Sequence, residues 1–473
     1  MFEDGPLRPD ADPSFVPLER LRRNEPGPEG ALVDSLKGRL GELAALLAPG
    51  EQDALAALLK SLEARNPYLL ELAALPPEAV LSAAEAEIYH ALPVLSANPA
   101  SRLPSAVCLI VKGTRLCNLR CTYCRSWAEG PDQVMPFNVL ARTVQTACTS
   151  PGAEQVEFIW HGGETTLRPV SFYRKALWLQ ERLRPARLRI TNQIQTNGTK
   201  LTPEWLRFLK QYRFRVGVSL DGPPEVHDRR RLDVKGRPTS HRVRQGMAEL
   251  SRQGIAFAVS MVVDEEVRSL GARRVLDYFL ELGVHNVSLL NVVPDGEPER
   301  ELTGDFLAFP SYVRFLQDLF QLWWPEHADR ISFREISDLI HRLERGQGSF
   351  CVFSENCMSH IYTIEPQGGI AACDRYQGDP AFSYGNVLDT ELSDLVASVN
   401  FRRAGEETEA EMDATRQCPW FSICHGGCPH DRYVRAHRGV SGDESCCGWS
   451  PLLADLASAL GKHARHHQPG AIP

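Results

Sequence analysis

The middle of the chain alternates short apolar runs with amphipathic stretches. Six runs follow one another from Ser105, and they are AVCLIVKG, QVEFIW, RLRITNQIQ, RVGVSL, IAFAVSMVV and NVSLLNVV. Helix-like segments such as FNVLARTVQTAC and PEWLRFLKQY separate them. Strands that alternate with helices pair in parallel, because a parallel connection needs a crossover. The pattern therefore predicts an α/β fold, and six units favour a partial (β/α)6 barrel over the full eight-stranded form.

The other segments differ in texture from the predicted barrel, residues 105–308. Residues 1–30 are rich in Pro, Gly and charge, which predicts a disordered N-terminus. Residues 31–100 repeat Leu and Ala at intervals of three and four, which predicts a small helical domain. The remaining predicted parts are a helical bridge over 309–350, a Cys- and Gly-rich domain over 351–450 and a C-terminal tail over 451–473.

Charge and hydropathy exclude several classes of partner. The 473 residues carry a formal net charge of −8 and show no long basic stripe, which argues against a nucleic-acid partner or an anionic membrane surface. The N-terminus MFEDGPLRPDADPSF does not resemble a secretory signal. No run reaches the roughly 18 apolar residues of a membrane span. We therefore expect a cytoplasmic protein that does not bind a membrane.

Thirteen cysteines need an explanation other than disulfides, because a reducing compartment keeps thiols free. Three lie together in CNLRCTYC, directly after the first predicted strand. Eight more lie in the C-terminal quarter, and they are Cys351, Cys357, Cys373, Cys418, Cys424, Cys428, Cys446 and Cys447. Such grouping indicates ligation of metal or of iron–sulfur clusters.

The spacing in CNLRCTYC suits an iron–sulfur cluster. Cys117, Cys121 and Cys124 are separated by three and two residues. Three thiolates can hold three irons of a cubane and leave the fourth iron for an exogenous ligand. Structural zinc normally has four protein ligands, usually in two separated pairs, so zinc is the less favoured alternative.

This motif resembles that of the radical S-adenosylmethionine (SAM) superfamily, with Tyr123 in the aromatic position before the third cysteine. The resemblance covers about residues 105–450. It implies a 4Fe-4S cluster on Cys117, Cys121 and Cys124 whose open iron binds SAM. It also implies reductive cleavage of SAM to a 5'-deoxyadenosyl radical, which abstracts a substrate hydrogen atom, with a flavodoxin or ferredoxin as electron donor.

Three later strand ends resemble segments of the branch of that superfamily that modifies peptides and sulfatases. In WHGGETT two glycines would let carbonyls approach the SAM ammonium, which a carboxylate complements. The segments QTNGT and SLDGP follow the next two strands. The resemblance implies cofactor contacts at Tyr123, Gly162, Gly163, Glu164, Gln195, Asn197, Ser219 and Arg242. The crowded arginines 229–231 leave a solvated basic run as the alternative at Arg242.

The later cysteines resemble the SPASM domain, which carries auxiliary iron–sulfur clusters. Carried over by position, the first cluster would be held by Cys351, Cys357, Cys373 and Cys428. The second would be held by Cys418, Cys424 and Cys446. The family pattern has another cysteine three residues before Cys418, where this chain has Thr415. The fourth ligand is therefore left open among Cys447, Asp413 and a substrate group, or this cluster does not assemble. A zinc-bound structural domain is the alternative for the whole region.

Asp374 follows Cys373 directly in GGIAACDRY. In sulfatase-maturing relatives an aspartate at this place is proposed to accept the proton that an oxidised substrate loses, which is the work of a general base. The same residue could instead be a carboxylate that only forms hydrogen bonds near a cluster.

The resemblance implies a peptide-modifying oxidoreductase. The leading hypothesis is a maturase that cross-links a ribosomally made precursor peptide (RiPP), because the residues before the barrel could grip a leader peptide. The alternative is an anaerobic sulfatase-maturing enzyme, which makes formylglycine from Cys or Ser. A non-enzymatic electron carrier or zinc-binding protein is a third class, and it would make GGETT and SLDGP accidental.

Overall fold

The computed structural model describes residues 66–291 apart from 94–100, 125, 127–129 and 131, residues 307–438 apart from 325 and 356, and residues 446–461. The predicted disordered N-terminus, residues 31–65 of the predicted helical domain and the tail beyond 461 lie outside these residues. The chain divides into two compact units, Met1–Ala74 and Leu75–Pro473. The described part of the first is Asn66 and helix α4 (Pro67–Ala74). The fold and the site below belong to the second.

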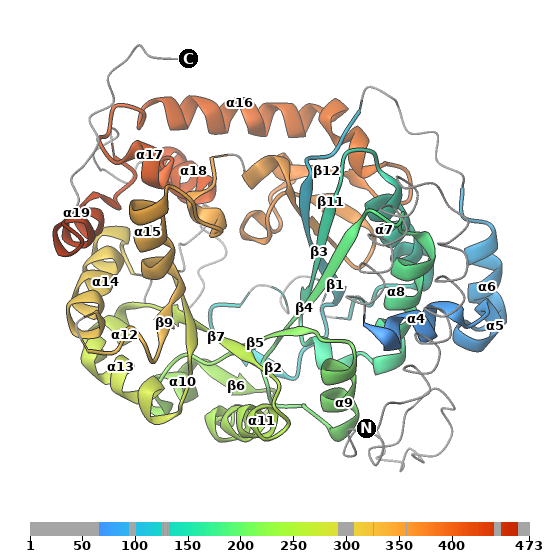
Figure 1. Ribbon diagram of the computed structural model, residues 1–473, viewed down its shortest axis with the longest axis horizontal. Coiled ribbons are helices and arrows are strands. Elements are labelled where there is room, and N and C mark those ends of the chain that lie inside the picture. The colour runs from blue at the N-terminus through green and yellow to red at the C-terminus, as the bar shows by residue number, and fades with distance from the viewer. Residues whose placement is uncertain are drawn as a thin grey trace, which may run out of the picture. The chain divides into compact units, whose positions relative to one another are not determined.

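All six predicted strands are present. They are β1 (Ala106–Thr114), β3 (Gln155–Gly162), β4 (Arg189–Thr196), β5 (Arg215–Ser219), β7 (Phe257–Val263) and β8 (Asn286–Asn291). Each pairs in parallel with the next, in the order β1-β3-β4-β5-β7-β8. Figure 1 shows these strands inside a ring of helices. The prediction of an α/β partial barrel is confirmed.

The sheet continues beyond the barrel at both edges, which the sequence did not predict. β9 (Ser332–Phe333) pairs with β8. At the other edge β10 (Ile361–Ile364) lies parallel to β1, and β11 (Gly369–Ala371) and β12 (Ser383–Asn386) follow antiparallel. The Cys-rich region is therefore partly built on the barrel sheet. A separate ribbon pairs β2 (Leu119–Cys121) with β6 (Arg231–Asp233).

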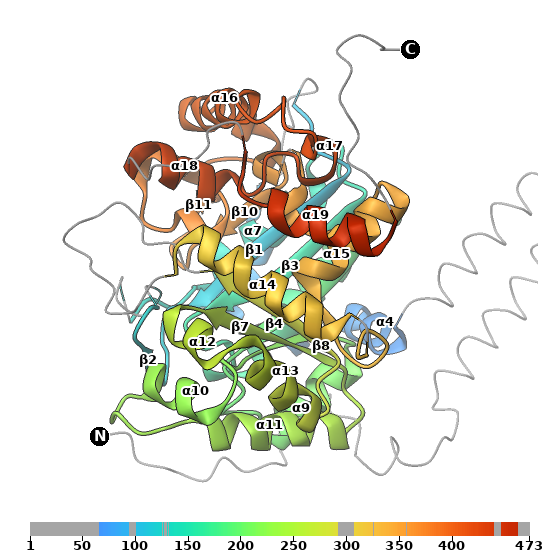
Figure 2. The same cartoon turned by 90° about the vertical axis from the view of Figure 1, so that its left-hand side faces the viewer.

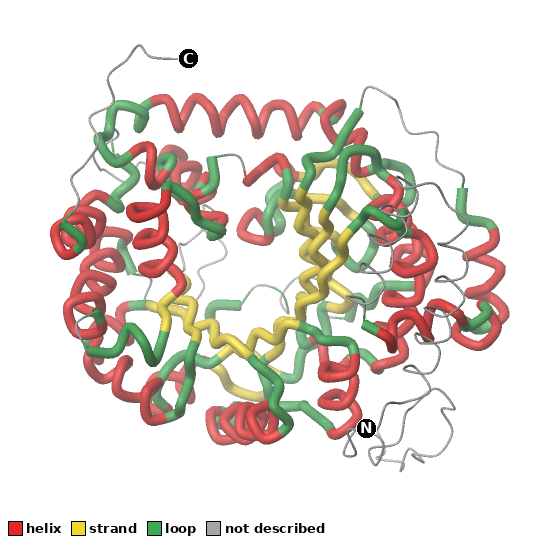
Figure 3. The backbone as a smooth tube through the Cα atoms, viewed as in Figure 1, coloured by secondary structure: helices red, strands yellow, loops and turns green. Residues whose placement is uncertain are grey.

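Helices cover the outside of the strands (Figures 2 and 3). Those up to the end of the predicted bridge are α5 (Pro77–Val80), α6 (Ala83–His90), α7 (Phe137–Thr149), α8 (Val170–Leu183), α9 (Pro203–Gln211), α10 (Pro224–Arg230), α11 (Ser240–Arg252), α12 (Glu265–Leu270), α13 (Ala272–Glu281), α14 (Phe309–Trp323) and α15 (Arg334–Arg345). The Cys-rich region adds α16 (Val399–Asp413), α17 (Phe421–Cys424), α18 (Pro429–Arg438) and α19 (Ser450–Ala459). Among the described residues, no helix is long and apolar enough to cross a bilayer.

Alternation along the strands divides the core from the barrel interior. On β3, Phe158 and Trp160 are buried, and the Trp160 ring lies 5.3 Å from that of Tyr173 on α8. The intervening Glu157 and Ile159 line a cavity instead. The period of two thus gives each strand an apolar face under the helices and a face toward the barrel interior. Because the six strands are parallel, their C-terminal ends meet at one rim, where the loops can form a site.

Candidate active site

The three cysteines of CNLRCTYC lie in the loop after β1 and around β2. β2 pairs with β6 in the register Cys121↔Arg231. The Leu119 amide donates to Cys117 Sγ at 3.4 Å, and Arg231 Nη1 lies 3.9 Å from Cys121 Sγ. Hydrogen bonds to the sulfurs are one of the levers by which proteins tune an iron–sulfur cluster. The loop thus supplies donors to two of its three sulfurs, as a cluster-binding loop would.

The chemistry of these thiols fits a cluster. Burial raises the pKa of both Cys117 and Cys121 to about 12. They are therefore protonated at neutral pH until a bound cation displaces the protons. In the described residues, no three Cys, His, Asp or Glu side chains surround one point as ligands of a single metal ion do. A cubane does not need that arrangement, because each thiolate binds its own iron. The donor set therefore suits an iron–sulfur cluster better than a zinc ion.

A buried ionic network holds Tyr123 behind this loop. The Tyr123 hydroxyl donates to Asp221 Oδ2 at 2.6 Å, and Arg231 Nε donates to the same oxygen at 2.9 Å. Burial alone would raise the pKa of Asp221, but the charges of Arg231 and Arg230 lower it well below its usual range. Arg230 and Arg231 are themselves buried. The basic run before Arg242 is therefore largely a structural network, not a solvated surface.

The glycines of WHGGETT are required by close packing. Gly162 has a φ of +117°, and a Cβ there would lie 2.2 Å from the Thr114 carbonyl oxygen. A Cβ on Gly163 would lie 2.1 Å from the Leu116 oxygen. The Gly163 and Glu164 amides donate to Thr114 and Leu116 at 2.8 and 2.7 Å. The end of β3 is thus bound to the segment that leads into the cluster loop.

The Glu164 carboxylate already has several donors. It is 1% exposed, and it accepts hydrogen bonds from the Thr166 amide at 2.9 Å, the Thr196 hydroxyl at 2.6 Å and the Asn197 amide at 2.7 Å. Its place in the structure is that of a brace between the ends of β3 and β4. Any contact with a cofactor ammonium would come in addition to these bonds.

The other predicted cofactor residues differ in what they contact. Gln195 Nε2 donates to the Ser219 hydroxyl at 2.9 Å, so these two lie together on β4 and β5. The Asn197 side chain is committed to Asn118 in the cluster loop, at 2.9 Å. Nε and Nη2 of Arg242 are buried without a hydrogen-bond partner in the described structure, and Nη2 lies 3.8 Å from Asp233. Arg242 can therefore bind an anion.

Four of the later cysteines form a second group beside the barrel. They are Cys351, Cys357, Cys373 and Cys428. Burial, together with the neighbouring Cys351, raises the pKa of Cys373 to about 12. Arg375 Nη1 donates to Cys428 Sγ at 3.3 Å, while Arg375 Nη2 pairs with Asp431 at 2.8 Å. The structure thus brings together the four thiols that the sequence assigned to the first auxiliary cluster.

Cys418, Cys424, Cys446 and Cys447 form a third group. The Cys424 and Cys447 sulfurs lie 3.4 Å apart. The side chain of Cys446 is within hydrogen-bonding reach of those of Cys418 and Cys447. The hydroxyl of Thr415, which stands at the missing cysteine position, donates to the Met412 carbonyl at 2.7 Å.

Asp374 is the centre of an ion-pair network that the sequence did not predict. Lys112 Nζ lies 2.6 Å from Asp374 Oδ1 and 3.0 Å from Glu365 Oε1. Burial alone would raise the pKa of Asp374, but the Lys112 charge, with that of His161, lowers it to about 2. His161 Nδ1 lies 3.8 Å from Asp374 Oδ2. Asp374 is thus ionised at neutral pH and can accept a proton. The only sequence signal for Lys112 is a lysine inside an apolar strand.

A cavity of about 460 Å³ joins the first and second cysteine groups. Its wall includes Tyr123 and Cys124 from the cluster loop and Cys373 and Asp374 from the Cys-rich region. Asn291, at the end of β8, also contributes. A molecule in this cavity lies between the two groups, at the rim where the strands end.

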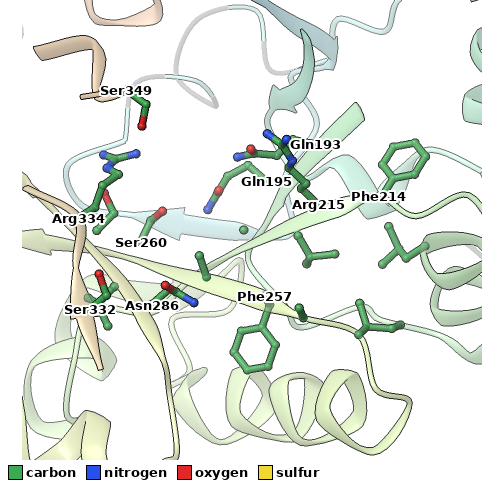
Figure 4. Close-up of a pocket in the computed structure, with 18 of the residues that line it drawn as sticks. Gln193, Gln195, Phe214, Arg215, Phe257, Ser260, Asn286, Ser332, Arg334 and Ser349 are labelled. Atoms are coloured by element: carbon green, nitrogen blue, oxygen red, sulfur yellow. The ribbon is translucent and has the colours of Figure 1, made fainter. Parts of the chain in front are cut away.

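A larger cavity, of about 700 Å³, lies in the barrel interior (Figure 4). Gln195 and Ser260 line it, together with Arg215 and Asn286 from the beginnings of their strands. None of its described lining residues is a cysteine. It therefore approaches the predicted cofactor residue Gln195 from the amino ends of the strands, away from the cysteine groups.

Comparisons with known proteins agree with this arrangement. A family model of the Radical SAM superfamily matches residues 111–269. The serine-type anaerobic sulfatase-maturating enzyme of Bacteroides thetaiotaomicron is 30% identical over 356 residues, which cover 70% of this chain and 84% of that protein. The cysteine-type enzyme of Clostridium perfringens is 27% identical, with 69% and 89% covered. The structure of native anSMEcpe with bound AdoMet and the Cp18Cys peptide is 25% identical, with a TM-score of 0.64, and the match covers 75% of this chain and 99% of that one.

Proposed function

Because the chain belongs to the radical SAM superfamily, in the family of the anaerobic sulfatase-maturating enzymes, we propose that it oxidises a side chain of a peptide or protein substrate. The observation that carries the proposal is the cavity between Cys124 and Cys373, with Asp374 in its wall. A substrate bound there lies next to the residues of both groups. The peptide named in the anSMEcpe complex supports the substrate class.

The residues divide the work as follows. Cys117, Cys121 and Cys124 hold a 4Fe-4S cluster, while Cys351, Cys357, Cys373 and Cys428 hold an auxiliary one. When bound, these clusters and SAM supply the radical that removes a hydrogen atom from the substrate and an acceptor for the electron that the substrate then loses. Arg242 and Ser219 bind the carboxylate of SAM, and the glycine carbonyls at the end of β3 bind its ammonium. Two buried nitrogens of Arg242 without a hydrogen-bond partner among the described residues support its part.

Asp374 accepts the proton that leaves with the second electron. Lys112 holds the carboxylate ionised and fixes its position at 2.6 Å. The balance for a seryl substrate is simple: the CH2OH group loses two hydrogens, one as an atom and one as a proton with an electron, and becomes an aldehyde. A flavodoxin or ferredoxin delivers the electron that starts each cycle.

The names of the relatives favour formylglycine as the product. Cross-linking of a precursor peptide is the second candidate, and the separate compact unit Met1–Ala74 favours it as an element that could grip a leader. Both candidates remove two hydrogens, but only formylglycine carries an aldehyde.

The test uses the anaerobically reconstituted protein with SAM, a low-potential reductant and peptides that contain Ser, Cys or neither. Mass analysis is made before and after treatment with a hydrazide. A Ser peptide that loses two hydrogens and then reacts with the hydrazide supports formylglycine formation. The same loss without hydrazide reactivity supports the cross-link. Unchanged masses for all peptides, with SAM cleaved, count against both products.

A further inference from the structure

The third cysteine group solves a problem that the sequence poses. Position 415 holds Thr where the family pattern has a cysteine, which would leave Cys418, Cys424 and Cys446 one ligand short. Cys447 is the extra thiol, since it follows Cys446 directly. It is 4% exposed, and its sulfur lies 3.4 Å from that of Cys424.

The backbone around the adjacent pair is fixed from two sides. On α18, Arg435 donates from Nη1 to the Cys446 carbonyl at 3.0 Å and from Nη2 to the Cys447 carbonyl at 3.1 Å. The Gly448 amide donates to Cys446 Sγ at 3.3 Å. A Cβ on Gly427, whose φ is +73°, would lie 3.3 Å from the Cys447 Cβ. The pair is therefore held against the loop that carries Cys424.

The other candidate ligands are engaged elsewhere. The Asp413 side chain is 63% exposed and pairs with Arg416 at 2.6 Å. The Thr415 hydroxyl donates to a backbone carbonyl of its own helix. His425 lines a cavity on the side of Cys351 and Cys373. Among the described side chains near this group, Cys447 alone adds a soft thiolate, the ligand that iron–sulfur clusters take.

We propose that Cys447 replaces the cysteine missing at position 415 and closes a four-thiolate site with Cys418, Cys424 and Cys446. The inference rests on the auxiliary clusters of the proposed function, and the occupant is a 4Fe-4S cluster. A site closed by four thiolates has no open iron. This cluster therefore cannot take a substrate group as ligand, and it serves only to carry electrons.

The test is made on a background in which Cys117, Cys121 and Cys124 are all Ala, so that no SAM chemistry is measured. After reconstitution with iron and sulfide, this protein should hold about eight irons per chain, as two clusters. Cys447→Ala should either lower the iron to about four per chain or yield a [3Fe–4S] signal in electron paramagnetic resonance after mild oxidation. Adding Thr415→Cys to Cys447→Ala should restore the parent iron content and spectrum.

Cys148→Ala is the matched control, because this buried thiol lies on α7 outside the three groups; it should change neither iron nor spectrum. Iron retained in the Cys351 group shows that Cys447→Ala still folds. Parent-like iron and spectrum in Cys447→Ala would overturn the proposal, as would loss of iron from His425→Ala instead. About one tightly held zinc per chain that reconstitution does not replace would overturn the cluster as occupant.

Discussion

At the scale of the residue, the ion pair between Lys112 and Asp374 decides how the substrate proton can leave. Lys112 is fully buried, and its ammonium lies between two carboxylates from a segment about 250 positions later in the chain. A buried ammonium is costly unless such partners surround it. The cost is accepted here because the same contact orients the carboxylate that lines the cavity. Lys112 is thus a positioning residue that acts through Asp374.

Replacement of Lys112 by Met should separate radical formation from product formation. Asp374 would lose its counter-ion and its fixed place, so we expect product to fall by about 10²-fold or more, as for Asp374→Asn. SAM cleavage should stay close to that of the parent. The measurement is the ratio of 5'-deoxyadenosine to product. Lys175→Met is the control, because Lys175 pairs with Glu85 away from the cysteines. An unchanged ratio in Lys112→Met would contradict this positioning role.

At the scale of the element, the end of β3 and the ribbon β2–β6 together position the cluster loop. The glycines let β3 approach the chain before Cys117, and Asp221 holds Tyr123 just before Cys124. The glycine pair could be predicted from WHGGETT. The Asp221 network could not, because three consecutive arginines look the same in sequence whether they are buried or solvated.

Gly163→Ala should damage the cluster loop, because its Cβ would meet two backbone oxygens within 2.5 Å. We expect loss of most SAM cleavage and less iron in the first cluster, with the auxiliary clusters retained. Gly405→Ala is the control, since Gly405 lies within α16 with open space around its Cβ. It should stabilise the helix by about 0.5–1 kcal/mol. Wild-type iron content in Gly163→Ala would contradict the packing argument.

Asp221→Asn should destabilise the apoprotein by about 3–5 kcal/mol at pH 7, because it leaves buried arginines without their counter-ion. Since folding lowers the pKa of Asp221, its contribution is present above about pH 4 and is lost as the pH falls through the folded pKa. Thermal unfolding of wild type and variant should therefore converge in acid. Asp389→Asn, at an exposed carboxylate, should follow wild type throughout. A difference that grows in acid would have the wrong sign.

At the scale of the whole molecule, the sequence predicts the parts better than the contacts between them. Alternating runs predicted the six barrel strands, and cysteine spacing predicted which thiols come together in the second group. The extension of the sheet by β10 could not be predicted, because IYTI shows no signal that its partner is β1. Lys112 and Glu365 likewise meet only because that pairing brings two distant segments side by side. The cavity between the two cysteine groups is a product of the same pairing.

The central claim is that a substrate carbon in this cavity gives up its hydrogen to the SAM-derived radical. The most direct measurement uses a seryl or cysteinyl peptide with deuterium on the side-chain CH2 carbon, and follows 5'-deoxyadenosine and peptide by mass spectrometry. The account predicts deuterium in the 5'-deoxyadenosine, in proportion to the peptide product. Product formed with no deuterium transferred would contradict it.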